Sequence, residues 1–447
     1  PVQQGVIWVG SNDGPVHVTR DGGKTWTDVT PKKLPPGGRV DAVEPSPHDP
    51  AKAYISVLRY QLGDRKPYIY KTENFGKSWT LLTTGSNGIP ADYPTRVVRE
   101  DPVREGLLFA GTEYGMFVSM DDGKNWKSFQ QNLPVTPITD LKIHRGDLAI
   151  STMGRSFWVL DNIESLRNGN FTIVDSPMLL PRKKTIRYRM PSGAYNSRRP
   201  RYPGPSVTMD YYLPEGNMPV QLEIRNKSGN IISFTNDSTV ASPNSKTPEA
   251  IRNMSTEFTS VILNQSLSNK KGWNRFKWDM RMMGPWNKSK NRRFRNGPMV
   301  LPGKYEASLI TPGNTTIAFE FEIVADPRVL ASGVTEADMK AQYDFQIKVR
   351  DKMSEVLKLQ EELEQELKSL KKAKKSSESD IARKATIEEA LSQIKTSEGI
   401  YQQPMLAAQW RYLYSMVNQA DQVPGKDAYD RYEELTSWMA RVQNEVK

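Results

Sequence analysis

Short stretches of alternating apolar and polar residues, separated by turn residues, fill the first 165 positions of the chain. Four of them read strand, turn, strand: GVIWVGSNDGPVHVTRD, AYISVLRYQLGDRKPYIYKTEN, GLLFAGTEYGMFVSMDD and GDLAISTMGRSFWVLDN. Alternation with a period of two is typical of half-buried β-strands. One further inner strand is predicted ahead of each of the last three stretches, in RVDAVEPSPHDP, TRVVREDPVRE and ITDLKIHRG.

A turn motif follows the first three stretches and repeats about every 50 residues, a period that suits a four-stranded propeller blade. Asp or Asn caps the turn with its side chain, Gly accepts a positive φ, and Ser or Thr bonds back across the turn. Tryptophan then fills the gap between neighbouring sheets. The motif residues are Thr19, Asp21, Gly23, Thr25 and Trp26; Thr72, Asn74, Gly76, Ser78 and Trp79; Ser119, Asp121, Gly123 and Trp126.

Residues 1–165 therefore predict a partial β-propeller of about three and a half blades. The first copy lacks its innermost strand, and the fourth ends after three strands without the turn motif. Propellers need roughly 4–8 blades, and an open arc leaves sheet edges exposed. We therefore expect the N-terminal half of the propeller to come from the same precursor or from a second chain.

The pattern changes twice after the arc. Residues 166–200 are rich in Arg and Pro and predict a linker, and residues 201–328 contain alternating segments that predict a β-sandwich. Residues 335–447 have a helical period and predict an antiparallel α-helical bundle. The first helix carries a stripe that predicts either the core of this bundle or a coiled-coil interface with a partner: Val356, Leu359, Leu363, Leu367 and Leu370.

Composition narrows the possible chemistry. The chain has no cysteine, which removes disulfides, thiolate zinc sites and cysteine nucleophiles. Its three histidines, His17, His48 and His144, share no metal-ligand spacing, so neither a metal nor a cofactor is expected. The net charge of +11 is spread over short clusters that match no nucleic-acid motif. No apolar run approaches the ~18 residues of a membrane helix, so a surface-associated complex is the closest link to a membrane that we expect.

The turn motif, S/T-x-D-x-G-x-T-W, resembles the Asp box of BNR repeats. Together with STMGRSFWVLDN at 151–162, it makes the chain similar to the C-terminal part of bacterial sortilin-like β-propeller proteins, which are often labelled glycosyl hydrolases. GWNRFKWDMR, LPGKYEASLI and IVADPRV extend the resemblance to an Ig-like β-sandwich and its junction with a helical tail. The resemblance implies a secreted, extracellular or bacterial cell-surface protein. It also implies that the box carboxylates have a structural role only.

Ligand contacts are expected on the face opposite the box turns, where the loops between second and third strands meet. These loops supply the candidate ligand-binding residues Asn12, Asp13, Tyr60, Asp64, Arg65, Glu113, Tyr114 and Arg155. Asp13 and Glu113 occupy matching loops two blades apart, but sequence cannot give the carboxyl separation that a glycosidase requires. No catalytic residue is therefore assigned.

Two functions stay open. The first is a secreted or cell-surface scaffold that binds a peptide, a protein or a glycan within a larger assembly. The second is a glycoside hydrolase of the BNR-repeat type whose active site is shared with the missing half of the propeller. Release of reducing sugar that disappears on Asp13→Asn or Glu113→Gln would favour the hydrolase.

Overall fold

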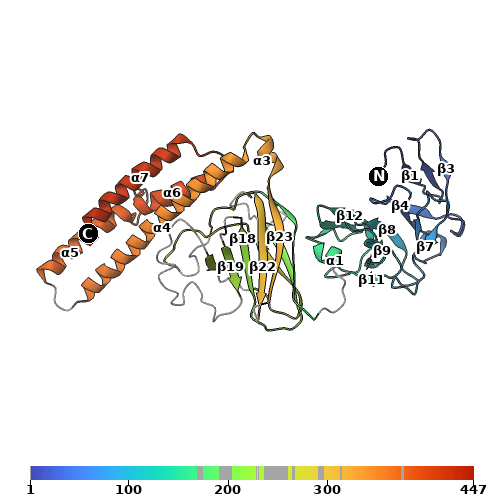
Figure 1. Ribbon diagram of the computed structural model, residues 1–447, viewed down its shortest axis with the longest axis horizontal. Helices are drawn as coiled ribbons and strands as arrows, with labels where there is room; N and C mark the ends of the chain where they lie inside the picture. The colour runs from blue at the N-terminus through green and yellow to red at the C-terminus, as the bar shows by residue number, and fades with distance from the viewer. Residues whose placement is uncertain are drawn as a thin grey trace. The chain divides into compact units, whose positions relative to one another are not determined.

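The computed structural model divides into two compact units, residues 1–172 and 173–447, which we call unit 1 and unit 2 (Figure 1). Most of the chain forms β-sheet, in several small sheets, and the C-terminal region is helical. The described residues are 2–168, 175–190, 204–227, 229, 231–235, 260–263, 267–289, 296–312, 315–373 and 377–447.

Unit 1 contains four small antiparallel sheets in chain order, which we call blades 1 to 4. Their strands are connected one to the next, so each sheet is a simple meander. A short 3-10 helix, η1(Tyr60–Leu62), lies within blade 2, and α1(Glu164–Asn168) follows blade 4. Blade 1 holds β1(Ile7–Gly10), β2(Val16–Thr19) and β3(Thr27–Asp28); blade 2 holds β4(Arg39–Pro45), β5(Ala53–Leu58), β6(Ile69–Thr72) and β7(Thr80–Leu81); blade 3 holds β8(Thr95–Glu100), β9(Leu108–Thr112), β10(Gly115–Ser119) and β11(Lys127–Ser128); blade 4 holds β12(Ile138–His144), β13(Asp147–Thr152) and β14(Phe157–Leu160).

Neighbouring blades pack face to face through apolar side chains. Three separate cores join blade 1 to blade 2, blade 2 to blade 3, and blade 3 to blade 4. Alternate residues of one strand enter different cores: Phe109 of β9 faces blade 4, whereas Leu108 and Ala110 face blade 2. Both faces of blade 3 are therefore buried, because a neighbouring blade covers each of them.

The repeated turns form the hydrogen bonds that their sequence predicts. In the first, the Thr25 amide and hydroxyl donate to the two Asp21 carboxylate oxygens at 2.9 and 2.7 Å. The Gly23 amide donates to Thr19 Oγ1 at 3.0 Å. The third turn repeats the pattern with Asn125 in place of Thr, and in the second the Asn74 amide donates to Ser78 Oγ at 2.8 Å. Each polar substitution in the motif thus keeps a closed hydrogen-bond ring.

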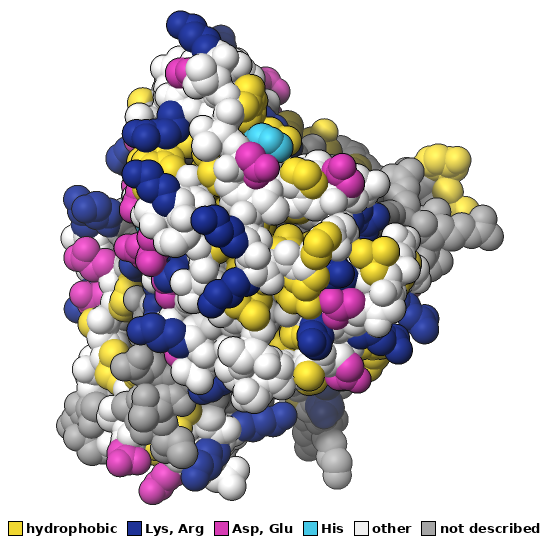
Figure 2. Space-filling model, turned by 90° about the vertical axis from the view of Figure 1, so that its right-hand side faces the viewer, with side chains coloured by type: hydrophobic (Ala, Val, Ile, Leu, Met, Phe, Trp, Pro, Cys, Tyr) yellow, Lys and Arg dark blue, Asp and Glu magenta, His cyan; other side chains and the backbone are white. Residues whose placement is uncertain are grey.

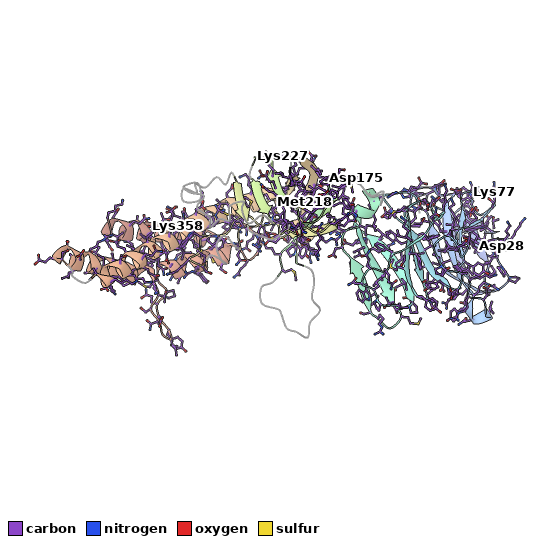
Figure 3. The ribbon with its side chains drawn as sticks, turned by 90° about the horizontal axis from the view of Figure 1, so that it is seen from below. Asp28, Lys77, Asp175, Met218, Lys227 and Lys358 are labelled. Carbon is purple, nitrogen blue, oxygen red and sulfur yellow. The ribbon has the colours of Figure 1, made fainter. Side chains whose placement is uncertain are left out.

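Unit 2 begins with two sheets that share one core. The smaller sheet has the order β15(Met178–Pro181), β17(Val207–Leu213), β21(Gly272–Trp278). The larger has the order β16(Lys184–Arg187), β23(Thr315–Ala325), β22(Gly303–Thr311), β18(Gln221–Asn226), β19(Ile231–Thr235), β20(Ser260–Leu263). Met209 and Trp278 of the smaller sheet meet Leu222 and Leu309 of the larger one, and Met218 packs against this core (Figure 3). The two sheets therefore lie face to face.

The segment 166–200 differs from the expected linker. It contains the last residues of α1 and, in unit 2, the strands β15 and β16, one in each sheet. The sequence there resembles a basic loop, since β16 ends with an arginine, Arg187, where an apolar residue would be expected in a buried strand. The charge of the buried Arg187 is compensated by an ion pair at 2.7 Å with Asp421, which lies far away in the sequence. Residues 191–200 lie outside the described part of the chain.

The described helices of unit 2 are α3(Pro327–Ala331), α4(Glu336–Lys372), α5(Glu378–Ile394), α6(Leu406–Val417) and α7(Lys426–Glu445). The last four share one core, to which α3 contributes no buried residue. Helix α4 begins with a capping box formed by Thr335 and Asp338, and α5 begins with one formed by Ser377 and Asp380. The stripe from Val356 to Leu370 is buried or half-buried in this shared core. Its intramolecular packing supports the bundle interpretation of the stripe rather than the coiled-coil one.

Polar contacts hold the helices of unit 2 to its sheets. Arg187 of β16 and the neighbouring Arg189 both pair with Asp421, each at 2.7 Å, in the segment between α6 and α7. Trp286 packs against both the sheet core and the helical core. The Tyr414 hydroxyl of α6 donates to the Asn296 carbonyl at 2.8 Å.

Candidate functional site

The innermost strands of blades 2, 3 and 4 each contain a β-bulge at the same place. The pairing register shifts between Val40 and Ala42, between Thr95 and Val97, and between Ile138 and Asp140. The residues left unpaired are Asp41, Arg96 and Thr139. A bulge bends its strand and re-aims a side chain, and bulges are common beside functional sites. The repeated bulge therefore marks one end of the inner strands as a candidate site.

Arg96 is the centre of this site and is buried. Its Nε and Nη2 atoms lie 2.6 Å from Glu113 Oε1, and its Nη1 lies 3.6 Å from Asp41 Oδ2 of the neighbouring blade. Asp41 also accepts a hydrogen bond from Arg39. Arginine holds carboxylates in a fixed planar geometry, so these four charged groups are pre-arranged across two blades.

Arg65 and Tyr114 form a second pair, which lies next to the Arg96–Glu113 pair because Tyr114 follows Glu113 in the chain. Arg65 Nη2 donates to the Tyr114 hydroxyl at 2.8 Å, and the rings of Tyr93 and Tyr114 lie 4.8 Å apart. Three candidates from the sequence, Arg65, Glu113 and Tyr114, are thus brought together. We call the whole group the inner-strand site: Arg39, Asp41, Arg65, Arg96, Glu113 and Tyr114.

The other candidates have different surroundings. The hydrogen bond to Asp41 raises the pKa of Arg39, and the nearby Tyr60 adds to this effect, so Tyr60 borders the site. Asp64 instead accepts from Arg59 at 3.0 Å and from the Tyr68 hydroxyl at 2.8 Å, which holds its own loop in place. Asn12, Asp13 and Arg155 are exposed. Within the described residues, no hydrogen bond or ion pair joins Asp13 to Glu113.

The candidates from the sequence did not include Arg39, Asp41 or the central Arg96, because they were taken only from the loops between second and third strands. All three lie near the start of an inner strand, and in the first of these strands RVDAV breaks strict alternation by one position. That break is the signature of a bulge. With TRVV and ITDL beside it, the same break recurs in three blades and could have indicated the site.

Further along the inner strands, one arginine lies between two carboxylates. Arg99 Nη1 is 3.4 Å from Glu44 Oε2, and its Nη2 donates to Asp140 Oδ1 at 2.8 Å. Burial raises the pKa of Glu44 to about 7, although Arg99 and Lys142 act in the opposite direction. A carboxyl group with that pKa can gain or lose a proton near neutral pH.

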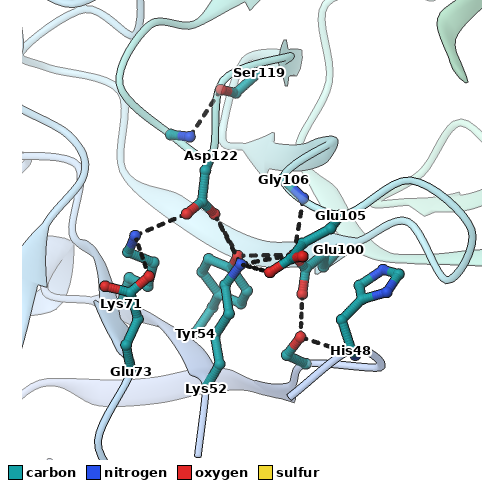
Figure 4. A network of polar contacts seen from close by, with 12 residues as sticks. His48, Lys52, Tyr54, Lys71, Glu73, Glu100, Glu105, Gly106, Ser119 and Asp122 are labelled. Atoms are coloured by element: carbon teal, nitrogen blue, oxygen red, sulfur yellow. Dashed lines mark hydrogen bonds and ion pairs between the residues drawn. The ribbon is translucent and has the colours of Figure 1, made fainter. Parts of the chain in front are cut away.

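A buried network also ties blade 2 to blade 3 (Figure 4). The Glu100 carboxylate accepts from Ser46 Oγ, Lys52 Nζ, the Tyr54 hydroxyl and the Gly106 amide, at 2.5, 3.0, 3.1 and 3.0 Å. The Tyr54 hydroxyl also lies 2.5 Å from Asp122 Oδ1, so its single proton is shared between the two carboxylates. Burial and the neighbouring Glu100 raise the pKa of Tyr54, which keeps the phenol protonated. This tyrosine therefore joins two carboxylates and does not serve as an anionic nucleophile.

The described residues contain neither a metal-binding cluster nor a membrane-spanning helix. No cluster of three or more histidine, aspartate or glutamate side chains is placed to hold a metal ion. No described helix has the length and apolar character needed to cross a membrane.

Comparison with known proteins assigns this chain to no family. No family model matches the sequence, and no curated protein matches it. Similar solved structures include YCF48 bound to D1 peptide, with 18% identity, 36% of this chain and 49% of that chain covered, and a TM-score of 0.29. The Niastella koreensis GH74 enzyme has 12% identity, 72% and 52% coverage, and a TM-score of 0.30. A hybrid two-component system extracellular domain from B. thetaiotaomicron has 11% identity, 73% and 39% coverage, and a TM-score of 0.26.

These structures are β-propeller proteins. The chain spans at most 52% of the length of the first four structures that it matches.

Proposed function

We propose that unit 1 is a binding scaffold whose inner-strand site recognises a polypeptide segment that carries a carboxylate. The observation that supports this most is the Arg96 clamp, because it fixes Asp41 and Glu113 and leaves the exposed Arg65 beside a tyrosine pair. A guanidinium group binds a carboxylate through two parallel hydrogen bonds, and tyrosine offers contact area at a small entropic cost.

The site is built before any ligand arrives. Arg96 is buried and already paired with Asp41 and Glu113, so binding a ligand does not carry the entropic cost of ordering this side chain. Arg65 is exposed and forms its hydrogen bond to Tyr114 through Nη2. We assign Arg96 to positioning and Arg65 with Tyr114 to direct contact.

The same proposal includes the origin and partners of the protein. We propose that the turns are Asp boxes of a BNR-repeat, sortilin-like bacterial protein that is secreted or held at the cell surface. We also propose that the N-terminal half of the propeller completes the ring, and that 201–328 is an Ig-like sandwich between the arc and the helical bundle of 335–447. The three antiparallel meanders with a closed turn support the repeat assignment.

Binding can be tested on the chain with immobilised peptide and glycan arrays. Acidic peptides should bind, and Arg65→Ala with Tyr114→Phe should reduce that affinity about tenfold or more, since hydrogen bonds to charged groups contribute roughly 1.5–3 kcal/mol. Arg20→Ala removes an exposed arginine that stacks on Phe75, away from the site, and serves as the matched control. Equal loss with Arg20→Ala, or binding of uronate oligosaccharides alone, would contradict the proposal.

The Glu44 carboxyl supports a second candidate, a glycoside hydrolase. A general acid needs a raised pKa, and Glu44 shares Arg99 with the second carboxylate, Asp140. Reducing-sugar release from a polysaccharide panel tests it, with Glu44→Gln expected to abolish release and Glu105→Gln, an exposed control, to leave it unchanged. Activity that survives Glu44→Gln excludes this role for Glu44.

A further inference from the structure

The two ends of the arc expose positions that are buried in its interior. In β9 of blade 3, Leu108 and Ala110 face the preceding blade and are both 0% exposed. The pairing registers place Ile7 and Val9 of blade 1 at the matching positions, and both are 45% exposed. Figure 2 looks onto the side where β1 and β3 lie in Figure 1, and hydrophobic side chains gather there between Lys and Arg.

The last blade shows the same contrast on its opposite face. Met116 and Val118 of β10 face the following blade and are 2% and 4% exposed. Phe157 and Val159 of β14 occupy the matching positions and are 81% and 61% exposed. Each end face is thus an interior blade face without its neighbour.

The turn motif shows what a neighbour provides. The Trp79 indole N–H donates to the Val29 carbonyl at 2.6 Å, and that of Trp126 donates to the Leu82 carbonyl at 3.0 Å. Both acceptors lie three residues after the turn tryptophan of the preceding blade.

The turn glycines complete this contact. A Cβ added to Gly76 would approach Val29 to 2.4 Å, and one added to Gly123 would approach Leu82 to 2.5 Å, so each turn glycine also packs on the preceding blade. At Gly23 such an atom meets only the chain's own Trp26, at 3.9 Å.

We propose that both end faces dock against propeller blades of another stretch of polypeptide. This inference rests on the proposed completion of the ring and specifies its contacts. Against Trp26, the partner presents an aliphatic residue placed three positions after a turn tryptophan, with its carbonyl accepting the Trp26 N–H. Against Phe157 and Val159 it presents small or aliphatic residues of a second strand, as Leu148 and Ile150 do for blade 3.

A second copy of the chain does not fit these faces. Blades 2 and 3 have four strands, whereas blades 1 and 4 have three in the part of the chain that the structure describes. Closing the ring also requires an inner strand beside β1 and an outer strand beside β14. Every described strand of unit 1 is already paired within its own blade. The occupant must therefore bring strands that another copy lacks.

The absence of cysteine allows a clean test. Single variants Trp26→Cys and Phe157→Cys, with Tyr401→Cys as a fully exposed control in unit 2, are treated with benzophenone maleimide. Labelling rates are compared between the isolated chain and the material purified from source cells. We expect all three thiols to react alike in the isolated chain, and those at positions 26 and 157 to react at least tenfold more slowly in the native material. The partner peptides that photo-crosslink to position 26 should contain a tryptophan followed three positions later by an aliphatic residue.

Three results would overturn the inference: unprotected thiols in the native material, crosslinked peptides without the turn motif, or crosslinks joining position 26 of one copy to position 157 of another. None of the variants replaces a residue of the inner-strand site, so peptide binding can be measured in the same samples. Lost protection with intact binding defeats only this inference. Intact protection with no binding defeats only the ligand proposal.

Discussion

Replacing the turn tryptophans one at a time would test how the blades hold together. Trp126 is 4% exposed and donates to the Leu82 carbonyl, whereas Trp26 is 45% exposed. The two residues have the same place in the motif and differ in whether a preceding blade covers them. Trp126→Ala and Trp26→Ala are therefore a matched pair in which only the interface changes.

The structure gives the expected magnitudes. Burying a tryptophan removes roughly 250 Å² from water, worth about 6 kcal/mol at ~25 cal/mol per Å² as an upper figure. Measured costs of Trp→Ala in cores are about 3–5 kcal/mol, and the Leu82 carbonyl would also lose its donor. We expect about 4 kcal/mol for Trp126→Ala. Trp26→Ala leaves no closed cavity and should cost about 1 kcal/mol.

Hydrogen exchange read by mass spectrometry suits this comparison, because a multidomain chain does not unfold in one step. About 4 kcal/mol corresponds to roughly a thousandfold faster exchange in β9 and β10. Trp26→Ala should accelerate exchange in β1 and β2 about fivefold, and α4 in unit 2 is an internal control for both variants. Equal acceleration by the two variants would refute the idea that each turn tryptophan stabilises the interface with the preceding blade.

Three further predictions concern buried charge. Glu100→Gln should lower the free energy of unfolding of blades 2 and 3 by about 1–3 kcal/mol, since the buried Lys52 would lose the closest of its three carboxylate partners. The exposed Glu105→Gln, which removes a second and more solvated partner, should change exchange there by a few-fold at most. Burial raises the pKa of Glu44 from its ordinary 4.5 to about 7, so between these two pH values the folded state holds a proton that the unfolded state has released. The contribution of this group to the free energy of unfolding of unit 1 should be largest below about pH 4.5, and up to about 3 kcal/mol of it should be lost as the pH rises through 7. Chemical denaturation at a series of pH values should show a weaker pH dependence in Glu44→Gln. Asp421→Asn should destabilise unit 2 by about 3–5 kcal/mol because Arg187 is buried, while exposed Lys426→Ala should not, as thermal melts would show.

The strands and turns of unit 1 could be predicted because their causes are local. Alternation gives the strands, and the hydrogen bonds of each turn lie within seven consecutive residues, such as Thr19 to Thr25. At the inner-strand site, local breaks in alternation indicate the bulges but not the contacts between blades. Its central contact, Arg96 with Asp41, joins residues from two blades and depends on a bulge in each strand.

Buried polar residues account for most of the remaining differences. Arg187 and the strand that holds it looked like part of a basic linker, because Asp421, the acid that neutralises the arginine, follows more than 200 residues later. The turn glycines were interpreted through their positive φ alone. The structure adds a second cause, the close approach of Gly76 and Gly123 to the preceding blade, which no local pattern could reveal.

Blades 1 and 2 differ from blades 2 and 3 in the residues at the positions of the Glu100 hydrogen-bond network. Pairing places Pro45 of β4 where β8 has Glu100, and Trp8 of β1 where β5 has Tyr54. The Trp8 indole N–H is buried and has no hydrogen-bond partner, whereas the Tyr54 hydroxyl has two. An unpaired buried donor costs roughly 1–3 kcal/mol. Exchange in β1 and β2 of the isolated chain should therefore precede exchange in β9 and β10, and the opposite order would show that apolar packing alone secures the first blade.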